Sequence, residues 1–216
     1  MKEDTAMNRL YASTGVLAIA AFLGWSSFHW WSSSQNDAFF ACRSGNVAGG
    51  AIGGAFELVD QTGKTVTSQQ IFTKPALIYF GYTSCLDVCP LDNARNVEAA
   101  GLLAAPGSFA AQGIDVTPVF ISVDSARDTP AVLAAYSANF GDTMTSLTGS
   151  ADQVKVVADA FKVYYKVPDN ATGKYEVDHT ILTYLMLPKI GFADFFQRET
   201  TAKEMADKVA CFVKAS

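Results

Sequence analysis

The chain has 216 residues, of which 50% are hydrophobic and 17% are charged, and its formal net charge is −5 at pH 7. This length and apolar content allow one globular domain with a sizeable core and a short appendage, and they argue against general disorder. The lysines and arginines are scattered singly, without the basic stripe that nucleic-acid binding requires. Nucleic acid is therefore not an expected partner.

The appendage is an apolar stretch at residues 10–31 that contains no charged side chain. As a helix it would be about 33 Å long, close to the ~30 Å of bilayer hydrocarbon, so we predict a transmembrane anchor. Lys2 and Arg9 precede it and favour a cytoplasmic N-terminus at residues 1–9. The chain is thus expected to cross an inner membrane once, with its soluble part on the periplasmic side. A cleaved signal peptide, or more weakly a lipoprotein anchored at Cys42, is the alternative.

Residues 32–51 are polar and then rich in glycine, which predicts a tether leading to a domain at 52–216. The elements expected in that domain are, in chain order, a β-hairpin at 56–66, a buried strand at 76–81, a helix at about 91–103, a strand at 116–123, a helix at 130–140, a strand near 144–147, a helix at 151–164, a hairpin of 180–187 with 193–197, and a helix at 201–213. A β-α-β half followed by a β-β-α half predicts a thioredoxin-like α/β domain, in which helices flank a central mixed sheet.

The sequence CLDVCP at residues 85–90 directly follows the buried strand at 76–81. Active groups in open α/β sheets belong at the carboxyl ends of strands. Two cysteines four residues apart at the start of a helix would share one face, and the helix dipole favours thiolates, so both Cys85 and Cys89 are expected to be reactive. Three intervening residues leave room for a metal, and thiolates suit Cu(I), so the pair is predicted to hold one copper ion. A structural disulfide between them is the alternative.

Three blocks of sequence together resemble the signature blocks of the Sco/SenC copper chaperones: FGYTSCLDVCP at 80–90, ISVDSARDTP at 121–130 and VDHT at 177–180. The resemblance runs from about residue 52 to the last helix. It implies a tethered thioredoxin-like domain that binds one copper ion through Cys85, Cys89 and His179. It also implies delivery of copper to the binuclear copper centre of cytochrome c oxidase, or maintenance of the thiols of that centre. The implied partners are the copper-bearing oxidase subunit, an upstream copper donor and a thiol reductant.

Two aspartates have possible supporting roles at this site. Asp124 matches an aspartate that the family places near the metal, whereas Asp178 either orients the neighbouring histidine ring or faces solvent. The chain departs from the family pattern at Leu86 and Ser125, where proline is common, so the loop between the cysteines is expected to be less constrained. Zinc fits the same two-sulfur, one-nitrogen ligand set. The sequence contains no nucleotide, flavin or haem motif.

Three classes of function remain open at this stage. A metallochaperone needs His179 as much as the two cysteines. A thiol-disulfide oxidoreductase would use Cys85 and Cys89 to reduce partner cysteines, and His179 would be nearly dispensable. A peroxidase would need an activated cysteine near a donor such as Arg95 or Arg127.

Two further cysteines, Cys42 and Cys211, lie after the anchor and in the last predicted helix. An outward-facing domain lies in an oxidising compartment, so we predict a disulfide that ties the tether to the end of the fold. Two inert cysteines, or pairing of Cys42 between chains, are the alternatives.

Overall fold

The computed structural model describes residues 19–27, 39–43, 51–105, 113–169 and 171–216. The chain divides into two compact units, Met1–Ala41 and Cys42–Ser216. In the first unit residues 19–27 are helical, and the remainder of the anchor predicted at 10–31 lies outside the described residues. Within the described ranges, no helix has both the length and the apolar character needed to cross a membrane.

The second unit contains a seven-stranded sheet, within its described residues, in the order β2-β1-β5-β4-β3-β8-β9. Its centre consists of three parallel strands, β3 (Ala76–Gly81), β4 (Thr117–Ser122) and β5 (Thr145–Thr148). All six residues of β3 are buried, as expected for a strand with neighbours on both sides and helices on both faces. The predicted buried strand at 76–81 is confirmed.

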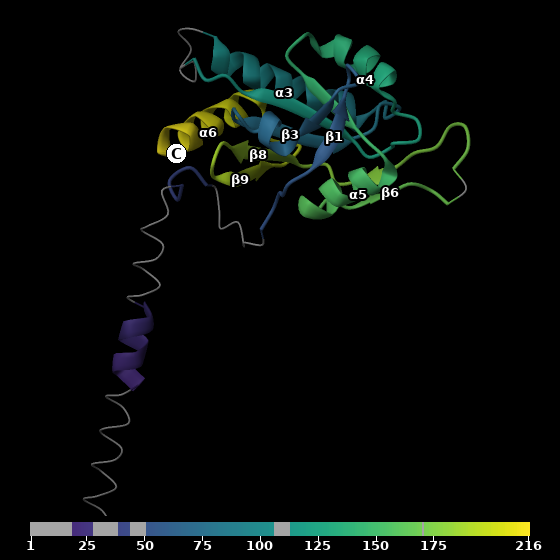
Figure 1. Ribbon diagram of the computed structural model, residues 1–216. Helices are drawn as coiled ribbons and strands as arrows, with labels where there is room; N and C mark the ends of the chain where they lie inside the picture. The colour runs from purple at the N-terminus through teal and green to yellow at the C-terminus, as the bar shows by residue number, and fades with distance from the viewer. Residues whose placement is uncertain (1–18, 28–38, 44–50, 106–112, 170) are drawn as a thin grey trace, which may run out of the picture. The chain divides into compact units, whose positions relative to one another are not determined.

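An antiparallel hairpin extends the sheet at each edge (Figure 1). β1 (Glu57–Asp60) pairs with β5 and with β2 (Thr65–Thr67). β8 (Thr183–Leu187) pairs with β3 and with β9 (Gly191–Phe196). Both hairpins were expected, and the mixed sheet confirms the thioredoxin-like α/β fold.

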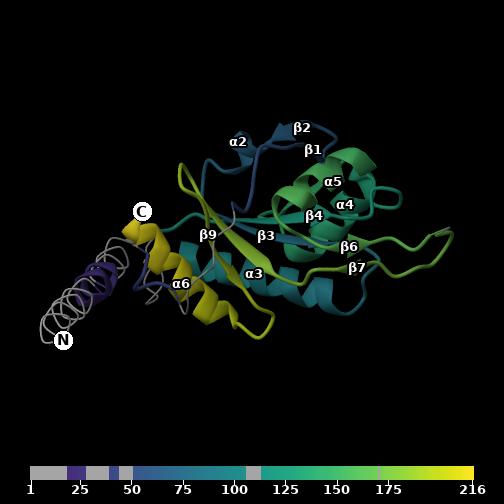
Figure 2. The ribbon, with the colours of Figure 1, turned by 90° about the horizontal axis from the view of Figure 1, so that it is seen from below.

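Helices cover both faces of the sheet (Figures 1 and 2). α3 (Val88–Ala104), α4 (Pro130–Ser137) and α6 (Ala202–Ala215) lie on one face, and α5 (Ala151–Ala160) lies on the other. Two successive crossovers move in the same direction across the sheet: β3–α3–β4 and β4–α4–β5. Because such crossovers are right-handed, α3 and α4 lie on the same face.

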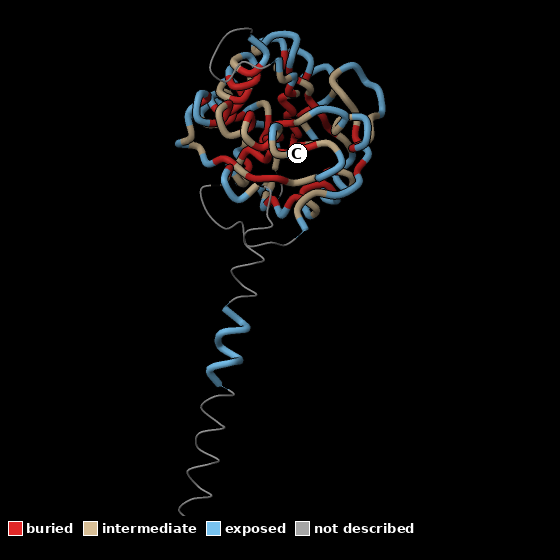
Figure 3. The backbone as a smooth tube through the Cα atoms, turned by 90° about the vertical axis from the view of Figure 1, so that its left-hand side faces the viewer, coloured by how far each residue is buried: buried red, intermediate tan, exposed pale blue. Residues whose placement is uncertain are grey.

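Packing follows the alternation of side chains along β3. Phe80 points towards the α5 face, where its ring lies 5.4 Å from that of Phe161. On the opposite face, Asn93 of α3 donates a hydrogen bond to the Tyr136 hydroxyl of α4, 3.0 Å away. Figure 3 shows the buried residues gathered inside this unit.

The start of α3 differs from that of the other long helices. Thr129, Ser150 and Thr201 cap α4, α5 and α6, each accepting a hydrogen bond from a main-chain N–H of the first turn. The cap residue of α3, Asp87, makes no such bond. The first N–H groups of α3 are therefore available to a neighbouring anion.

Three short elements were not predicted from the sequence: α2 (Ser68–Ile71), β6 (Tyr165–Lys166) and β7 (Asp178–His179). Two to four residues are too few for a periodic pattern to register. The helix predicted at 151–164 ends early, at Ala160, because the chain turns at Lys162, whose φ is 57°, to enter β6.

The predicted disulfide is confirmed. Cys42 and Cys211 are bonded, with their Cα atoms 5.6 Å apart and 169 positions between them in sequence. This bond joins the segment before the sheet to α6. Cys42 accordingly belongs to the same compact unit as the rest of the domain.

Candidate metal centre

Cys85 and Cys89 occupy different kinds of local structure. Because α3 begins at Val88, Cys89 lies in its first turn, whereas Cys85 lies in the preceding turn, where its N–H donates to the carbonyl oxygen of Tyr82 at 3.2 Å. The expectation that both sulfurs share one face of a helix is therefore wrong. The turn brings the sulfurs together instead, and the N–H of Cys89 donates to Cys85 Sγ at 3.4 Å.

A buried carboxylate holds this turn against the end of β4. Asp128 is 1% exposed. It accepts hydrogen bonds from the N–H of Thr83 at 2.9 Å and from the hydroxyls of Thr83 and Ser122, each at 2.5 Å. Burial raises the pKa of the Asp128 carboxyl despite these donors. The network fixes the residue two positions before Cys85.

His179 approaches the cysteines from a separate two-stranded sheet, in which β7 pairs His179 with Tyr165 of β6. Its Nδ1 lies 3.1 Å from the carbonyl oxygen of Thr180. A carbonyl can only accept a hydrogen bond, so this contact favours the proton on Nδ1 and leaves the lone pair on Nε2. Nε2 lies 3.4 Å from Cys89 Sγ.

The three predicted ligands converge. One ligand atom from each of Cys85, Cys89 and His179 lies within 4.8 Å of the others. Over the part of the chain that the structure describes, this is the only such cluster of histidine, cysteine and acidic side chains. Cys85 is 6% exposed and Cys89 is fully buried, while the histidine is partly exposed. The histidine side is therefore the more open approach to the sulfurs.

The two thiols have opposite electrostatic character. A hydrogen bond from the Cys89 thiol, aided by the N–H groups of Cys89 and Asp87, lowers the pKa of Cys85 to about 3 against the opposing effect of burial. The same hydrogen bond to Cys85, together with burial, raises the pKa of Cys89. Both cysteines were expected to be reactive, and the structure makes the Cys85 thiol the more acidic of the two, because the Cys89 thiol donates a hydrogen bond to it.

Neither of the two aspartates considered as supporting residues contacts a ligand atom directly. Asp124 is 1% exposed, pairs with Arg127 and accepts a hydrogen bond from the Tyr175 hydroxyl at 2.9 Å. Asp178 is exposed and lies opposite Lys166 in the β6–β7 pairing. Asp124 thus connects to the segment that precedes the histidine.

The two arginines considered for a peroxidase are committed to other contacts. Arg95 pairs with Asp92 and donates to the carbonyl oxygens of Gln197 and Arg198. Arg127 pairs with Asp124. These bonds give no support to an arginine that activates a cysteine.

Sequence analysis missed two residues that shape this centre. Gly81 leaves room for the Cys89 sulfur, because a Cβ built on it would lie 2.8 Å from Sγ. Tyr82 places its ring edge-to-face against the His179 ring, with the centroids 5.7 Å apart. Gly81 is the last residue of β3 and Tyr82 follows it directly, so their position at a strand end is the signal that could have indicated them.

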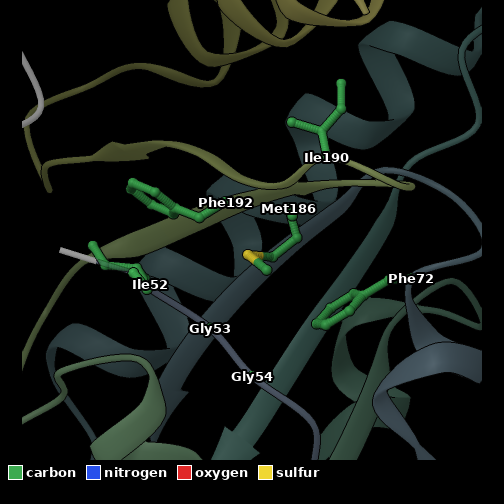
Figure 4. Close-up of a pocket in the computed structure, with 9 residues that line it drawn as sticks. Ile52, Gly53, Gly54, Phe72, Met186, Ile190 and Phe192 are labelled. Atoms are coloured by element: carbon green, nitrogen blue, oxygen red, sulfur yellow. The ribbon is translucent and has the colours of Figure 1, made fainter. Parts of the chain in front are cut away.

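A pocket of about 460 Å³ lies elsewhere in the domain (Figure 4). Ile52, Phe72, Met186 and Phe192 are among the residues that line it, and none of its lining residues is titratable. Met186 pairs with Ala76, the first residue of β3, whereas the cysteines follow the last residue. The pocket is thus at the opposite end of β3 from the three ligands.

The fold and the Cys-Cys-His cluster at the end of a central strand place this protein in the class of thioredoxin-like proteins with a candidate metal site. Residues 45–214 match the SCO1/SenC family model, so the chain belongs to the SCO1/SenC family. It is 46% identical over 182 residues to "Protein SenC" of Rhodobacter capsulatus, covering 84% of this chain and 80% of that protein. Identity to "Protein SCO1 homolog 1, mitochondrial" of Arabidopsis thaliana is 38% over 170 residues, which cover 78% of this chain and 49% of that longer protein.

A solved structure supports the same assignment. The crystal structure of Arabidopsis thaliana ScoI with copper bound matches with a TM-score of 0.71 and 35% sequence identity. The match covers 77% of this chain and all of that one.

Proposed function

We propose that this protein is a metallochaperone that binds one copper ion through Cys85, Cys89 and His179 and passes it to the binuclear copper centre of cytochrome c oxidase. The observation that carries the proposal is the convergence of two sulfurs and one imidazole nitrogen within 4.8 Å. Thiolates suit Cu(I) and imidazole suits both copper states. Copper is the cargo here, and membership of a family with a copper-bound solved member supports its choice over zinc.

The protonation states suggest how the ion is taken up. Cys85 already carries a thiolate, whereas the Cys89 proton must leave when that sulfur becomes a ligand. Uptake of copper therefore releases one proton from the pair. Three protein ligands leave room for a ligand from an incoming partner, so that the ion can be shared and then transferred.

The proposal includes a place in the cell. The charge-free stretch at 10–31 would hold the chain in an inner membrane, with the metal centre on the periplasmic side. There it would receive copper from an upstream donor and meet the copper-bearing subunit of the oxidase. A dithiol reductant would keep Cys85 and Cys89 reduced between cycles.

A direct test is copper binding by the reduced full-length chain in detergent, with metal analysis and absorption spectra. We expect one equivalent of copper, and strong weakening by His179→Ala and by Cys85→Ser/Cys89→Ser. Incubation of the loaded protein with the soluble copper-binding domain of the oxidase subunit should then move the ion to that domain. If the stoichiometry and affinity of copper binding are the same in His179→Ala as in the native chain, the proposed ligand set is refuted.

The unequal pKa values of the two thiols favour one alternative, reduction of a partner disulfide. The Cys85 thiolate would attack one partner sulfur, and Cys89 would then displace the second thiol, leaving a Cys85–Cys89 disulfide that a dithiol must reduce. This activity should survive His179→Ala, whereas copper binding should not. The two functions are thereby separated by one variant.

A further inference from the structure

The segment that carries His179 needs a fixed position relative to the cysteines. It arrives from β6 through a connection of eleven residues, of which residue 170 lies outside the described part, and β7 contributes only two residues of pairing. Two strands of two residues form a weak sheet. Contacts beyond that pairing must therefore hold Nε2 at 3.4 Å from Cys89 Sγ.

Arg127 supplies such contacts from the loop after β4. Its Nη1 donates to the carbonyl oxygen of Tyr175 at 2.9 Å, and its guanidinium carbon lies 3.5 Å from the centre of the Tyr175 ring. Its Nε pairs with Asp124, which also accepts from the Tyr175 hydroxyl at 2.9 Å. Main chain, ring and hydroxyl of Tyr175 are thus all engaged by one ion pair.

A second set of contacts joins the same segment to the cysteine turn. The Tyr82 hydroxyl hydrogen-bonds the carboxylate of Glu176, and the Tyr82 ring lies under the Arg127 guanidinium at 5.6 Å. The same ring also packs edge-to-face on His179. Tyr175 and Glu176 lie four and three positions before His179, so these contacts hold the chain close to the proposed ligand.

We infer that Arg127 is a positioning residue: with Asp124 and Tyr175 it forms a latch that holds the His179 segment against the cysteine turn and so sets the affinity for copper. The inference rests on the proposed function, because it concerns the same metal. Arginine suits the role since one planar group can bond a carboxylate and a carbonyl while stacking on a ring. Lysine offers a single point charge.

The test compares copper affinities of reduced full-length proteins by competition with a chelator. Arg127→Ala should weaken binding by about 10- to 100-fold, the range found for groups that orient metal ligands. Arg127→Lys should also weaken it, since charge alone does not reproduce the latch. The control Lys203→Ala removes one exposed positive charge from α6 and should leave affinity unchanged.

A double-mutant comparison distinguishes positioning from a general loss of structure. If Arg127 acts through the imidazole, adding Arg127→Ala to His179→Ala should weaken binding by less than about threefold further. The copper–imidazole spectroscopic signature should also diminish in Arg127→Ala itself. The latch is refuted if the losses of copper affinity caused by Arg127→Ala and by His179→Ala are fully additive, or if Arg127→Ala binds copper with native affinity.

Arg127→Ala leaves the buried Asp124 carboxylate without its partner, which threatens folding. Tyr175→Ala removes the partly exposed ring and hydroxyl of the latch but keeps the Arg127–Asp124 ion pair. It should weaken copper binding by the same factor as Arg127→Ala, and this loss should also disappear when His179 is already replaced. If His179→Ala itself leaves affinity unchanged, the proposed ligand set fails and the latch fails with it. If His179→Ala weakens binding while both latch variants bind like the native chain, only the latch is refuted.

Discussion

Replacing Gly81 by alanine should disturb the metal centre although none of the three proposed ligands is replaced. Gly81 is the last residue of β3, and a Cβ built there would lie 2.8 Å from Cys89 Sγ, 3.0 Å from the Phe120 ring and 3.1 Å from the Tyr79 ring. Ordinary contact begins at about 3.4 Å, so the sulfur would have to move by about 0.6 Å. Both rings are fully buried, so they offer little room for relaxation.

We expect this overpacking to lower the free energy of unfolding of the metal-free protein by about 1–3 kcal/mol. A displaced sulfur should also weaken copper binding by about 10- to 100-fold, as loss of a ligand-orienting group does. Urea denaturation measures the first effect, and competition with a chelator measures the second.

Gly101→Ala is the matched control, because Gly101 lies in α3 and, apart from its chain neighbours and the surrounding backbone of that helix, no atom lies within 4 Å of its added Cβ. Alanine there should raise stability by about 0.5–1 kcal/mol, since glycine weakens a helix interior, and copper affinity should not change. A Gly81→Ala protein with native stability and native copper affinity would refute the close approach of the sulfur to the strand.

Three further predictions concern the Cys85 thiol, the disulfide bond and the buried Asp128 carboxylate. In the reduced, metal-free protein the Cys85 thiol should titrate with a pKa of about 3, well below its ordinary value of 9.0, so the thiolate absorption should persist at neutral pH and disappear only as the pH falls towards that value. Cys89→Ala should raise this pKa, because the main hydrogen-bond donor is lost, and titration of the native thiol near 9 would contradict the assignment. Cys42→Ser/Cys211→Ser should lower the free energy of unfolding by about 2–5 kcal/mol, measured with urea, while the copper stoichiometry stays at its native value because neither cysteine belongs to the ligand cluster. Asp128→Ala should cost at least about 2 kcal/mol in the same assay, since the N–H and hydroxyl of Thr83 and the hydroxyl of Ser122 lose their acceptor; a change below about 0.5 kcal/mol would show that these bonds contribute little.

The central strand and the cysteine pair were accessible to sequence analysis for a physical reason. A buried parallel strand needs a continuous apolar run, and residues 76–80 supply one directly before the cysteines. The cysteine spacing and the strand–helix order then indicated a site at the carboxyl end of that strand. The disulfide was also predictable, because two unassigned cysteines remained in a domain expected to face an oxidising compartment.

The detailed geometry was not accessible in the same way. Whether Cys85 lies on α3 or before it depends on where the helix starts, and a shift of three residues decides it. The unequal pKa values of Cys85 and Cys89 arise from their mutual hydrogen bond and from burial, neither of which is a property of spacing. Sequence reasoning therefore predicted that both thiols are reactive but did not show which of the two is the more acidic.

The amino-acid sequence by itself determined the order of the strands and helices and the position of the two cysteines at a strand end, because these follow from the local hydrophobic pattern. His179 was indicated only by the resemblance of its sequence block to a known family. Only the tertiary structure decided that His179, 90 positions after Cys89, reaches its sulfur, that Gly81 makes room for that sulfur, and that Arg127 grips the segment before the histidine. These contacts join segments that are distant along the chain. Such contacts exist only once the sheet has set the distances between its strand ends, so no local pattern encodes them.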